Sequence, residues 1–417
     1  MRGALAALTT RGRSFLAAGS AALLCAFVLG EHDLLRIAVL ILALPLLAMM
    51  VVARTRYRLS CARRLDPARV EIGAESQVTL RLENVTRLPT GLLLIEDQIP
   101  FALGNRPRFV LDRVEARGAR EIVYRVRSDL RGRYQLGPLS VRIADPFGLV
   151  ELVRAFTITD SLTVMPRVVA LPPARLSGEW TGGGESRTRA VSSAGDDDVA
   201  PREYRQGDDL RRVHWRSTAR HGELMVRREE QQRQSRGALF LDTRRQVHGG
   251  EGAGSSFETA VSAAASIGVH LAKDGLGLRY VTDEGSVHLP EQSLAWSLLD
   301  HLALIRQSGG RSLDRGVSAL KEGGGDGLIV AVLGSLSDDE LTAFARLRHG
   351  GITGVAVLLD LPTWLDLHPS AVGPAAQAVD RAAETLRGAG WRIVRLAAGQ
   401  SLSDAWPAVA QHGRIVA

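Results

Sequence analysis

The chain has 417 residues, of which 45% are hydrophobic, and a formal net charge of +7. That length allows two or three domains, each with its own core. Arginine supplies nearly all of the 52 basic residues, and only 5% of the chain is aromatic. The positive charge therefore lacks the stacking side chains of a nucleic-acid-binding face, and we expect no nucleic-acid partner. With only Cys25 and Cys61, a disulfide framework or a cysteine-based metal site is excluded.

Two uncharged segments of 17 residues each lie near the N-terminus, SFLAAGSAALLCAFVLG (14–30) and IAVLILALPLLAMMVVA (37–53). Each approaches the length that an α-helix needs to cross a bilayer, so residues 1–55 are predicted to form a transmembrane hairpin with two spans. Arginines flank its outer ends, whereas the connecting turn carries Glu31 and Asp33. The positive-inside rule then places both termini and the soluble domains in the cytoplasm, at the cell membrane. A buried hairpin of a soluble domain is the alternative.

Residues 56–170 show the alternation of a half-buried antiparallel sheet. In QVTLRLEN (77–84) and REIVYRVRS (120–128), apolar and polar side chains follow one another with a period of two. Turn-forming residues separate such segments, as in LGP (136–138) and ADPFG (144–148). We predict an antiparallel β-sandwich that acts as a spacer or binding module, because no cluster of titratable side chains here suggests chemistry.

The remainder of the chain is predicted to contain a linker and an α/β domain. Residues 171–197 are rich in Gly, Pro and Ser, which is typical of a linker. From 237 to 417, short apolar strands such as GLIVAVLG (327–334) alternate with helical patterns, which indicates a mostly parallel sheet covered on both faces. Ligands of such sheets lie beyond the carboxyl ends of the strands, so Asp242, at the end of the first strand, is a candidate site.

Between the linker and this domain, residues 198–236 form a segment that is dense in arginine and aspartate. We interpret it as a structural clamp that also presents a partner surface. Acids and arginines can pair, Gly207 allows a turn, and Tyr204 and Trp215 supply large apolar bodies. The residues proposed to carry this role are Arg202, Glu203, Tyr204, Gly207, Asp208, Arg212, His214, Trp215 and Arg220.

Two other interpretations of this segment are weaker. An anion-binding or nucleic-acid-binding strip is disfavoured because Glu203, Asp208 and Asp209 would repel the same phosphates that the arginines attract. A hydrolase built on His214 and Asp208, with Ser217 as nucleophile, remains an alternative, but no nucleophile elbow or oxyanion loop accompanies these residues. We therefore predict that the protein is not an enzyme, with no cofactor and no small-molecule substrate.

The run REYRQGDDLRRVHWRSTARHGELMVRREE (202–230) resembles the signature of the domain-of-unknown-function family 58, and RGRYQLGPLSVRIADPFGL (131–149) is similar to the segment that precedes that signature. The order of parts also agrees: two spans, a β-rich region, the charged motif and a von Willebrand factor A-like, Rossmann-type domain. The resemblance implies a membrane-anchored protein that works beside a MoxR-type AAA+ ATPase, often with a transglutaminase-like membrane protein. We accordingly expect a cytosolic interaction scaffold, an adaptor in the assembly or maturation of other proteins.

One feature departs from that family pattern. The metal-ion-dependent adhesion site of von Willebrand factor A-like domains begins Asp-x-Ser-x-Ser, and its oxygens suit a hard divalent cation. Here the first Ser position is Arg244 and the second is Gln246. A guanidinium cannot ligate a metal and can instead pair with Asp242, so we predict a degenerate site without metal. The alternative, a metal-dependent adhesion domain at Asp242, would need substitute ligands such as Thr243, Asp338 or Asp339.

Overall fold

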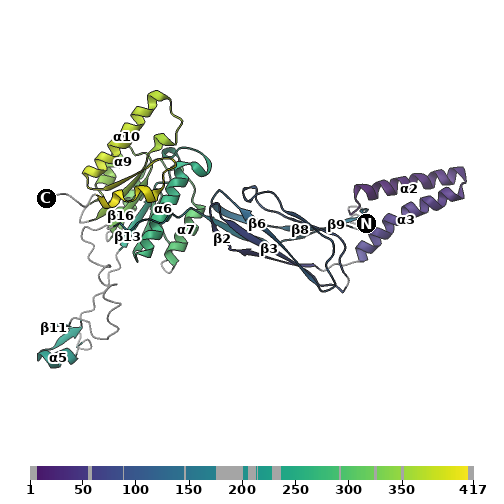
Figure 1. Cartoon of the computed structure of the whole chain (residues 1–417), viewed down its shortest axis with the longest axis horizontal. Coiled ribbons are helices and arrows are strands. Elements are labelled where there is room, and N and C mark those ends of the chain that lie inside the picture. The colour runs from purple at the N-terminus through teal and green to yellow at the C-terminus, as the bar shows by residue number, and fades with distance from the viewer. Residues whose placement is uncertain are drawn as a thin grey trace. The chain divides into compact units, whose positions relative to one another are not determined.

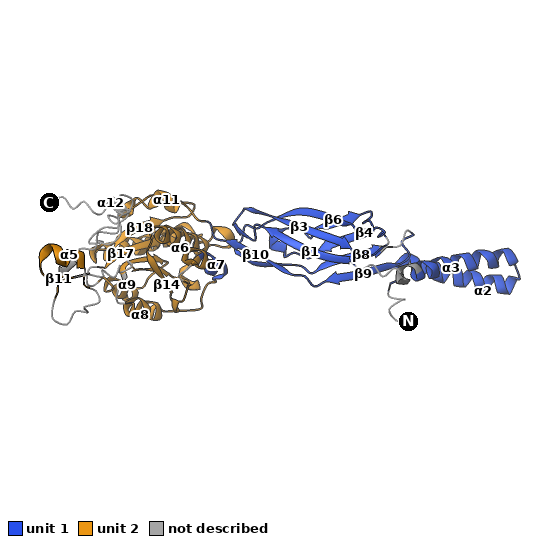
Figure 2. Cartoon of the chain, turned by 90° about the horizontal axis from the view of Figure 1, so that it is seen from below, with its two compact units in different colours: residues 1–167, 299–305 blue, residues 168–298, 306–417 orange. Residues whose placement is uncertain are grey.

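The structure is a computed structural model. It describes residues 7–54, 59–87, 89–144, 147–174, 201–204, 213, 215–227, 236–290, 293–323, 326–348 and 352–411. The linker was expected at 171–197; its residues 175–197 lie outside the described residues. The chain divides into two compact units, coloured separately in Figure 2. Unit 1 comprises residues 1–167 and 299–305, and unit 2 comprises residues 168–298 and 306–417.

Unit 1 begins with two apolar helices, α2 (Thr10–Leu29) and α3 (His32–Arg54), drawn in purple in Figure 1. Both are long and apolar enough to cross a membrane. Large apolar side chains cover their outer surface; Phe27 and Val28, for example, are 88% and 83% exposed. Gly19 of α2 lies so close to α3 that an added Cβ would come within 2.8 Å of the Leu42 side chain. The two helices expected from the sequence are therefore present, and they pack tightly against each other.

The rest of unit 1 consists of three small sheets. One has the order β1-β3-β6 and another the order β5-β4-β8-β9, both antiparallel throughout. In the third, β10 pairs with β7 in antiparallel and with β2 in parallel orientation. The strands are β1 (Leu59–Asp66), β2 (Arg69–Glu71), β3 (Glu75–Asn84), β4 (Leu93–Asp97), β5 (Arg108–Leu111), β6 (Ala119–Arg127), β7 (Gly132–Leu136), β8 (Leu139–Ala144), β9 (Glu151–Phe156) and β10 (Asp160–Met165).

The alternation in the sequence accounts for the core of these sheets. Val78, Leu80 and Leu82 of β3 are fully buried, whereas the polar residues between them are wholly or partly exposed. They share one core with side chains of the other sheets, such as Leu93 of β4 and Val141 of β8. Apolar side chains on one face of each strand thus gather between the sheets.

Unit 2 contains a six-stranded sheet with the order β15-β14-β13-β16-β17-β18. All neighbours are parallel except β15, which pairs with β14 in antiparallel orientation. Counted from β13, the order is 3-2-1-4-5-6, which is a doubly wound arrangement. The strands are β13 (Arg236–Leu241), β14 (Gly277–Thr282), β15 (Gly285–Val287), β16 (Asp326–Leu333), β17 (Thr353–Leu359) and β18 (Arg392–Leu396).

Helices α6 (Ser256–Lys273), α8 (Asp314–Glu322), α9 (Asp338–Ala345), α10 (Pro369–Gly388), α11 (Leu402–Ala405) and α12 (Ala408–Gln411) belong to the same unit, while α7 (Leu294–Leu304) runs across the boundary between the units. The central strands are buried on both faces, which explains their continuous apolar sequences. The multidomain layout with a mostly parallel C-terminal sheet is confirmed.

Because the strand order reverses between β13 and β16, the carboxyl ends of these two strands mark the position where ligands bind in such folds.

Candidate functional site

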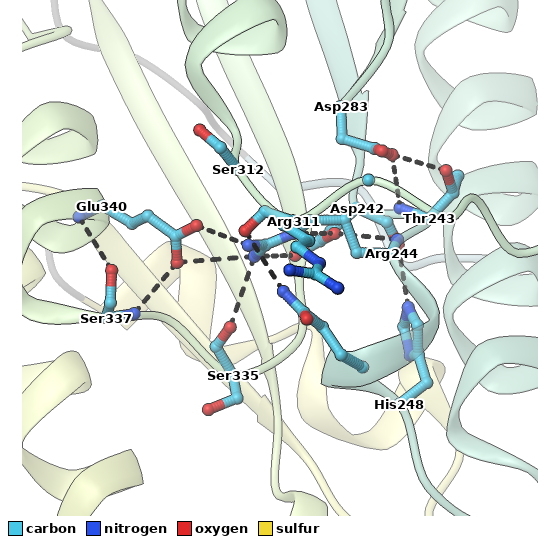
Figure 3. A network of polar contacts seen from close by, with 12 residues as sticks. Asp242, Thr243, Arg244, His248, Asp283, Arg311, Ser312, Ser335, Ser337 and Glu340 are labelled. Atoms are coloured by element: carbon cyan, nitrogen blue, oxygen red, sulfur yellow. Dashed lines mark hydrogen bonds and ion pairs between the residues drawn. The ribbon is translucent and has the colours of Figure 1, made fainter.

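A buried ionic network occupies the carboxyl ends of β13 and β16 (Figure 3). Asp242 directly follows β13, Arg244 lies two residues further on, and Glu340 comes from the first turn of α9, which follows β16. The side chains of Asp242 and Arg244 are 0% and 1% exposed, and that of Glu340 is 15% exposed. A cation and two carboxylates from two neighbouring strand ends are thus held out of water.

The guanidinium of Arg244 bridges the two carboxylates. Its Nε and Nη2 donate to Asp242 Oδ1 and Oδ2 at 3.0 and 2.8 Å, and its Nη1 donates to Glu340 Oε1. Burial alone would lower the pKa of Arg244, but the hydrogen bonds and charges of the two carboxylates outweigh burial and raise it. Arg244 is therefore a permanent cation that neutralises Asp242.

The position of Glu340 is set by the start of α9. Ser337 caps this helix: its hydroxyl accepts from Glu340 N at 3.4 Å, and Glu340 Oε2 accepts from Ser337 N at 3.0 Å. This reciprocal pair is a capping box, which the Ser-x-x-Glu spacing encodes locally. The same carboxylate binds Arg244, so one side chain both begins the helix and completes the network.

Asp283, which follows β14, extends the network to a third strand end. It is 3% exposed and accepts hydrogen bonds from the backbone N of Thr243 at 3.0 Å and from the hydroxyls of Thr243 and Ser308. The backbone N of Ser308 in turn donates to Thr243 O at 2.8 Å. Three carboxylates, one after each of β14, β13 and β16, thereby fix the loops at this edge of the sheet.

The side chain of His248 contacts the network at the backbone of Asp242. Its Nε2 lies 2.8 Å from the backbone O of Asp242, and its Nδ1 lies 3.2 Å from Ser256 Oγ. Burial lowers the pKa of His248, which favours the uncharged form. Because a carbonyl only accepts, Nε2 must carry the proton, and Nδ1 accepts from the Ser256 hydroxyl.

The geometry does not suit a divalent cation. Both oxygens of Asp242 already accept from Arg244, and the guanidinium lies where a metal would have to bind them. Within the part of the chain that the structure describes, no group of three or more His, Cys, Asp or Glu side chains could hold a metal ion. Of the substitute ligands considered from the sequence, Asp338 and Asp339 are exposed on α9, and Thr243 binds Asp283.

The sequence anticipated the pairing of Arg244 with Asp242, which is present. It did not indicate Glu340, Asp283 or His248. The capping box Ser337-x-x-Glu340 after a buried strand was the signal that could have located Glu340. No comparable local pattern marks Asp283 or His248, because only the strand order brings them to Asp242.

The charged motif forms a small ribbon with a helix. β11 (Pro201–Glu203) pairs in antiparallel orientation with β12 (Met225–Arg227), and α5 (Trp215–His221) lies between them in the chain. The backbone N of Tyr204 donates to Leu224 O at 2.8 Å, and that of Met225 donates to Thr218 Oγ1 at 3.0 Å. These bonds close the ribbon and hold α5 against it.

The structure places only some of the motif residues that the sequence singled out. Arg202 and Glu203 lie in β11, Tyr204 is half-buried after it, and Arg220 is exposed in the last turn of α5. Trp215 is 71% exposed, so it is not packed internally as a large apolar body against the described residues. Gly207, Asp208, Arg212 and His214, and with them the hydrolase alternative, lie outside the described residues.

A second buried network lies in unit 1, where the sequence indicated no titratable cluster. Arg63 and Asp97 form an ion pair of 2.5 Å with side chains 1% and 0% exposed, and the hydroxyl of Tyr124 donates to Asp97 at 2.6 Å. Burial, together with the bond to Asp97, raises the pKa of Tyr124. Burial also raises the pKa of Cys61 to about 11. These groups are paired and enclosed, so they stabilise the sheets rather than forming a reactive site.

Comparison with known proteins gives one family. Residues 200–318 match the family model described as "Protein of unknown function DUF58". The chain is 25% identical over 230 residues to the uncharacterized protein YeaD of Bacillus subtilis (strain 168), covering 52% of this chain and 54% of YeaD, so it spans about half the length of that curated relative.

Solved structures show only low similarity. A CARDB domain from Pyrococcus furiosus has a TM-score of 0.20 at 12% identity, with 25% of this chain and 93% of that chain covered. The DNA glycosylase AlkC of Pseudomonas fluorescens has a TM-score of 0.18 at 12% identity, with 32% and 39% covered. The family match, in contrast, contains the ribbon, α5 and the Asp242–Arg244 pair. Over residues 200–318, this chain therefore contains a segment of the DUF58 family of proteins of unknown function.

Proposed function

We propose that this protein is a membrane-anchored interaction scaffold in the cytosol that works without a bound metal. The observation that carries the proposal is the burial of Arg244 between Asp242 and Glu340. It lies beyond β13 and β16, where sheets of this strand order bind their ligands. A fixed cation from the chain itself takes that position and pairs with both carboxylates, so the buried Asp242 has a counter-charge without a metal.

Unit 2 is, in this proposal, a von Willebrand factor A-like domain with a degenerate adhesion site. The 3-2-1-4-5-6 strand order and the Asp at the end of the first strand support the assignment. A divalent cation would have to displace a guanidinium that makes two hydrogen bonds to Asp242 and two to Glu340. The metal-dependent adhesion alternative is therefore the weaker one.

The proposed partner is a MoxR-type AAA+ ATPase, with a transglutaminase-like membrane protein as a further associate. This choice rests on the resemblance of residues 131–149 and 202–230 to the family pattern. The surface proposed for the contact is the motif around α5, where Trp215 is 71% exposed beside the exposed Arg216. Tryptophan and arginine are the residues that most often dominate binding energy at protein interfaces.

The membrane orientation is part of the same proposal. α2 and α3 would cross the bilayer, with both chain ends in the cytoplasm because arginines flank the hairpin and acids occupy its turn. Two helices serve as an anchor in this scheme, and the soluble units carry the interaction.

The test is a pull-down of the detergent-solubilised full chain from its own cells, with and without EDTA. We compare the wild type with Trp215→Ala, and use Trp296→Ala as the matched control because Trp296 is also exposed, at 54%. Loss of an interfacial tryptophan should weaken recovery of the ATPase by about 2 kcal/mol, or roughly thirtyfold in affinity, whereas the control should behave as wild type.

Each outcome bears on a separate part of the proposal. Recovery of an AAA+ ATPase that persists in EDTA supports a metal-free scaffold. Recovery that disappears in EDTA would restore the metal-dependent alternative. If no ATPase is recovered under any condition, the proposed partner is wrong.

A further inference from the structure

We propose that the end of unit 1 from which α2 and α3 emerge is a surface that binds anionic phospholipids of the bilayer. This basal surface is defined by three exposed apolar side chains and three arginines: Val85, Leu92, Phe147, Arg87, Arg113 and Arg117. The inference rests on the membrane anchoring proposed above and adds to it a second, superficial contact with the same bilayer.

The first observation is that α2 is hydrogen-bonded to the connection between β8 and β9. The backbone N of Thr9 donates to Leu149 O at 3.0 Å, and the Thr9 hydroxyl also accepts from Gly12 N at 3.1 Å to cap the helix. Leu8 forms an antiparallel bridge with Val150, and both side chains are buried. A Cβ on Gly12 would lie 2.2 Å from Leu149 O, so only glycine permits this approach. The start of the helix is thus fixed on the sheets.

The second link to the hairpin is covalent. α3 ends at Arg54 and β1 begins at Leu59, so the chain between their Cα atoms spans at most about 18 Å. Leu59 pairs with Asn84, the last residue of β3. Val85 and Arg87 follow directly, which places this turn near the end of α3.

Hydrogen bonds join a third connection to that turn. The side chain of Asn84 donates to Glu115 O at 3.0 Å, and the backbone N of Arg117 donates to Thr86 O at 3.1 Å. The segment between β5 and β6, which carries Arg113 and Arg117, therefore lies beside the turn that follows β3.

The strand register brings the remaining apolar residues to the same end. Leu93, the first residue of β4, pairs with Ile143 near the end of β8. Leu92 therefore lies beside the connection that carries Phe147 and leads to the Thr9 contact. Phe147, Val85 and Leu92 are 63%, 58% and 46% exposed. Three large apolar side chains from two connections, β3–β4 and β8–β9, are thus exposed at the end that the proposed spans fix toward the bilayer.

The charge of this surface suits anionic lipid. Arg87, Arg113 and Arg117 are exposed, and none of them forms an ion pair with another described residue. Glu115 and Glu83 are engaged by Arg120 at 2.9 Å and by Arg81 at 3.5 Å, which leaves Asp112 as the opposing charge among the described residues of these connections. The sequence also has Asp145 two residues before Phe147. The exposed Arg11 and Arg13 in the first turns of α2 add further positive charge.

This combination matches the chemistry of the bilayer interface. Apolar side chains of a peripheral surface enter the boundary between headgroups and acyl chains, and basic residues close to an anionic leaflet each strengthen binding by about fivefold. Bound in this way, unit 1 would have a fixed orientation to the bilayer, set by headgroup contacts as well as by the two helices.

The test uses the full chain in nanodiscs of phosphatidylcholine, alone or mixed with phosphatidylglycerol. An environment-sensitive fluorophore is attached at Phe147→Cys in a Cys25→Ala background, since the buried Cys61 thiol does not react. Phe101→Cys is the matched control, because Phe101 is 90% exposed but lies beyond the opposite end of β4. We expect spin-labelled lipid to quench the probe at 147, more strongly with phosphatidylglycerol, and to leave the probe at 101 unquenched.

Charge removal tests the lipid specificity. The triple variant Arg87→Gln/Arg113→Gln/Arg117→Gln should lower the ratio of quenched to unquenched probe at least tenfold in the anionic discs, given about fivefold for each arginine. Arg106→Gln, in the same connection as Phe101, should leave the ratio unchanged. The absence of quenching at 147 would overturn the inference. Quenching of the same extent with and without phosphatidylglycerol, and with and without the triple substitution, would also overturn it.

Failure of the anchor is recognised separately. In the otherwise native chain, Cys25 lies on the exposed surface of α2 and is protected from a water-soluble maleimide only if α2 is inside the bilayer. Labelling of Cys25 in the discs would overturn the membrane anchor and the lipid surface together. Protection of Cys25 without quenching at 147 would overturn the lipid surface alone.

Discussion

Replacement of Arg244 by methionine should strongly destabilise unit 2. The substitution keeps an apolar stem and removes the cation that pairs with the fully buried Asp242. Breaking a buried ion pair by removing one partner costs about 3–5 kcal/mol. A second route gives a similar limit: the orphaned carboxyl can escape its charge by binding a proton, which costs about 4 kcal/mol at pH 7 for an ordinary aspartate pKa. Glu340, at 15% exposure, can regain water and should add little.

The size and the pH dependence of this effect can both be measured. For a unit of this size, each kcal/mol lowers the Tm by about 2–4 °C, so we expect a decrease of about 6–20 °C near pH 7. All six tryptophans lie in unit 2, so thermal unfolding followed by tryptophan fluorescence reports on this unit. Burial already raises the pKa of Asp242 in the wild type, although the hydrogen bonds and charge of Arg244 lower it, so removal of Arg244 should raise this pKa further. The loss should therefore shrink as the pH falls, by about 1.4 kcal/mol per pH unit.

Arg395→Met is the matched control, because Arg395 and its partner Asp380 are 41% and 55% exposed. Its effect should stay within about 0.5 kcal/mol. A loss below about 1 kcal/mol for Arg244→Met, or a loss that is the same at pH 5 and pH 7, would refute the reasoning from the buried pair.

Three further predictions concern the same networks. Arg244→Ser removes the guanidinium and adds an oxygen ligand, so Mg²⁺ should raise the Tm of this variant and leave that of the wild type unchanged. Equal changes in Tm would contradict the idea that the Arg244 guanidinium keeps a metal from Asp242. Burial lowers the pKa of His248 in the folded protein. Below pH ~6.5 the unfolded chain therefore binds more protons than the folded one, and the free energy of unfolding should fall as the pH falls. The slope should be at most about 1.4 kcal/mol per pH unit. His248→Gln should flatten that slope in denaturant titrations, and unchanged slopes would exclude His248 as the cause. Tyr124→Phe removes a hydrogen bond to the buried Asp97 and should cost about 1.5–3 kcal/mol, seen as faster hydrogen exchange in β3 and β6 with no change in β17.

The architecture followed largely from local patterns in the sequence. Uniform apolar segments marked α2 and α3, the period of two in QVTLRLEN marked β3, and the continuous apolar segment GLIVAVLG marked β16. These elements could be predicted because a strand or helix buries the same face along its whole length, so its apolar residues repeat at a regular spacing along the sequence.

Only part of the network at the strand ends could be predicted from the sequence. Asp242 and Arg244 are two residues apart, so their pairing could be inferred from the sequence. Glu340 is 96 residues from Arg244, and Asp283 is 40 residues from Thr243. Which distant carboxylate meets which strand end depends on the order of β14, β13 and β16 in the sheet, and that order has no local signature.

Long-range hydrogen bonding likewise decided the basal surface. Nothing in Thr9 or in the segment around Phe147 indicates that they meet, yet Thr9 and Leu149 are 140 residues apart and hydrogen-bonded. By itself the sequence determined the elements, their order and the local Asp242–Arg244 pair. Only the tertiary structure decided which distant side chains share a buried site or an exposed end, because such contacts depend on strand order and register rather than on the spacing of neighbouring residues.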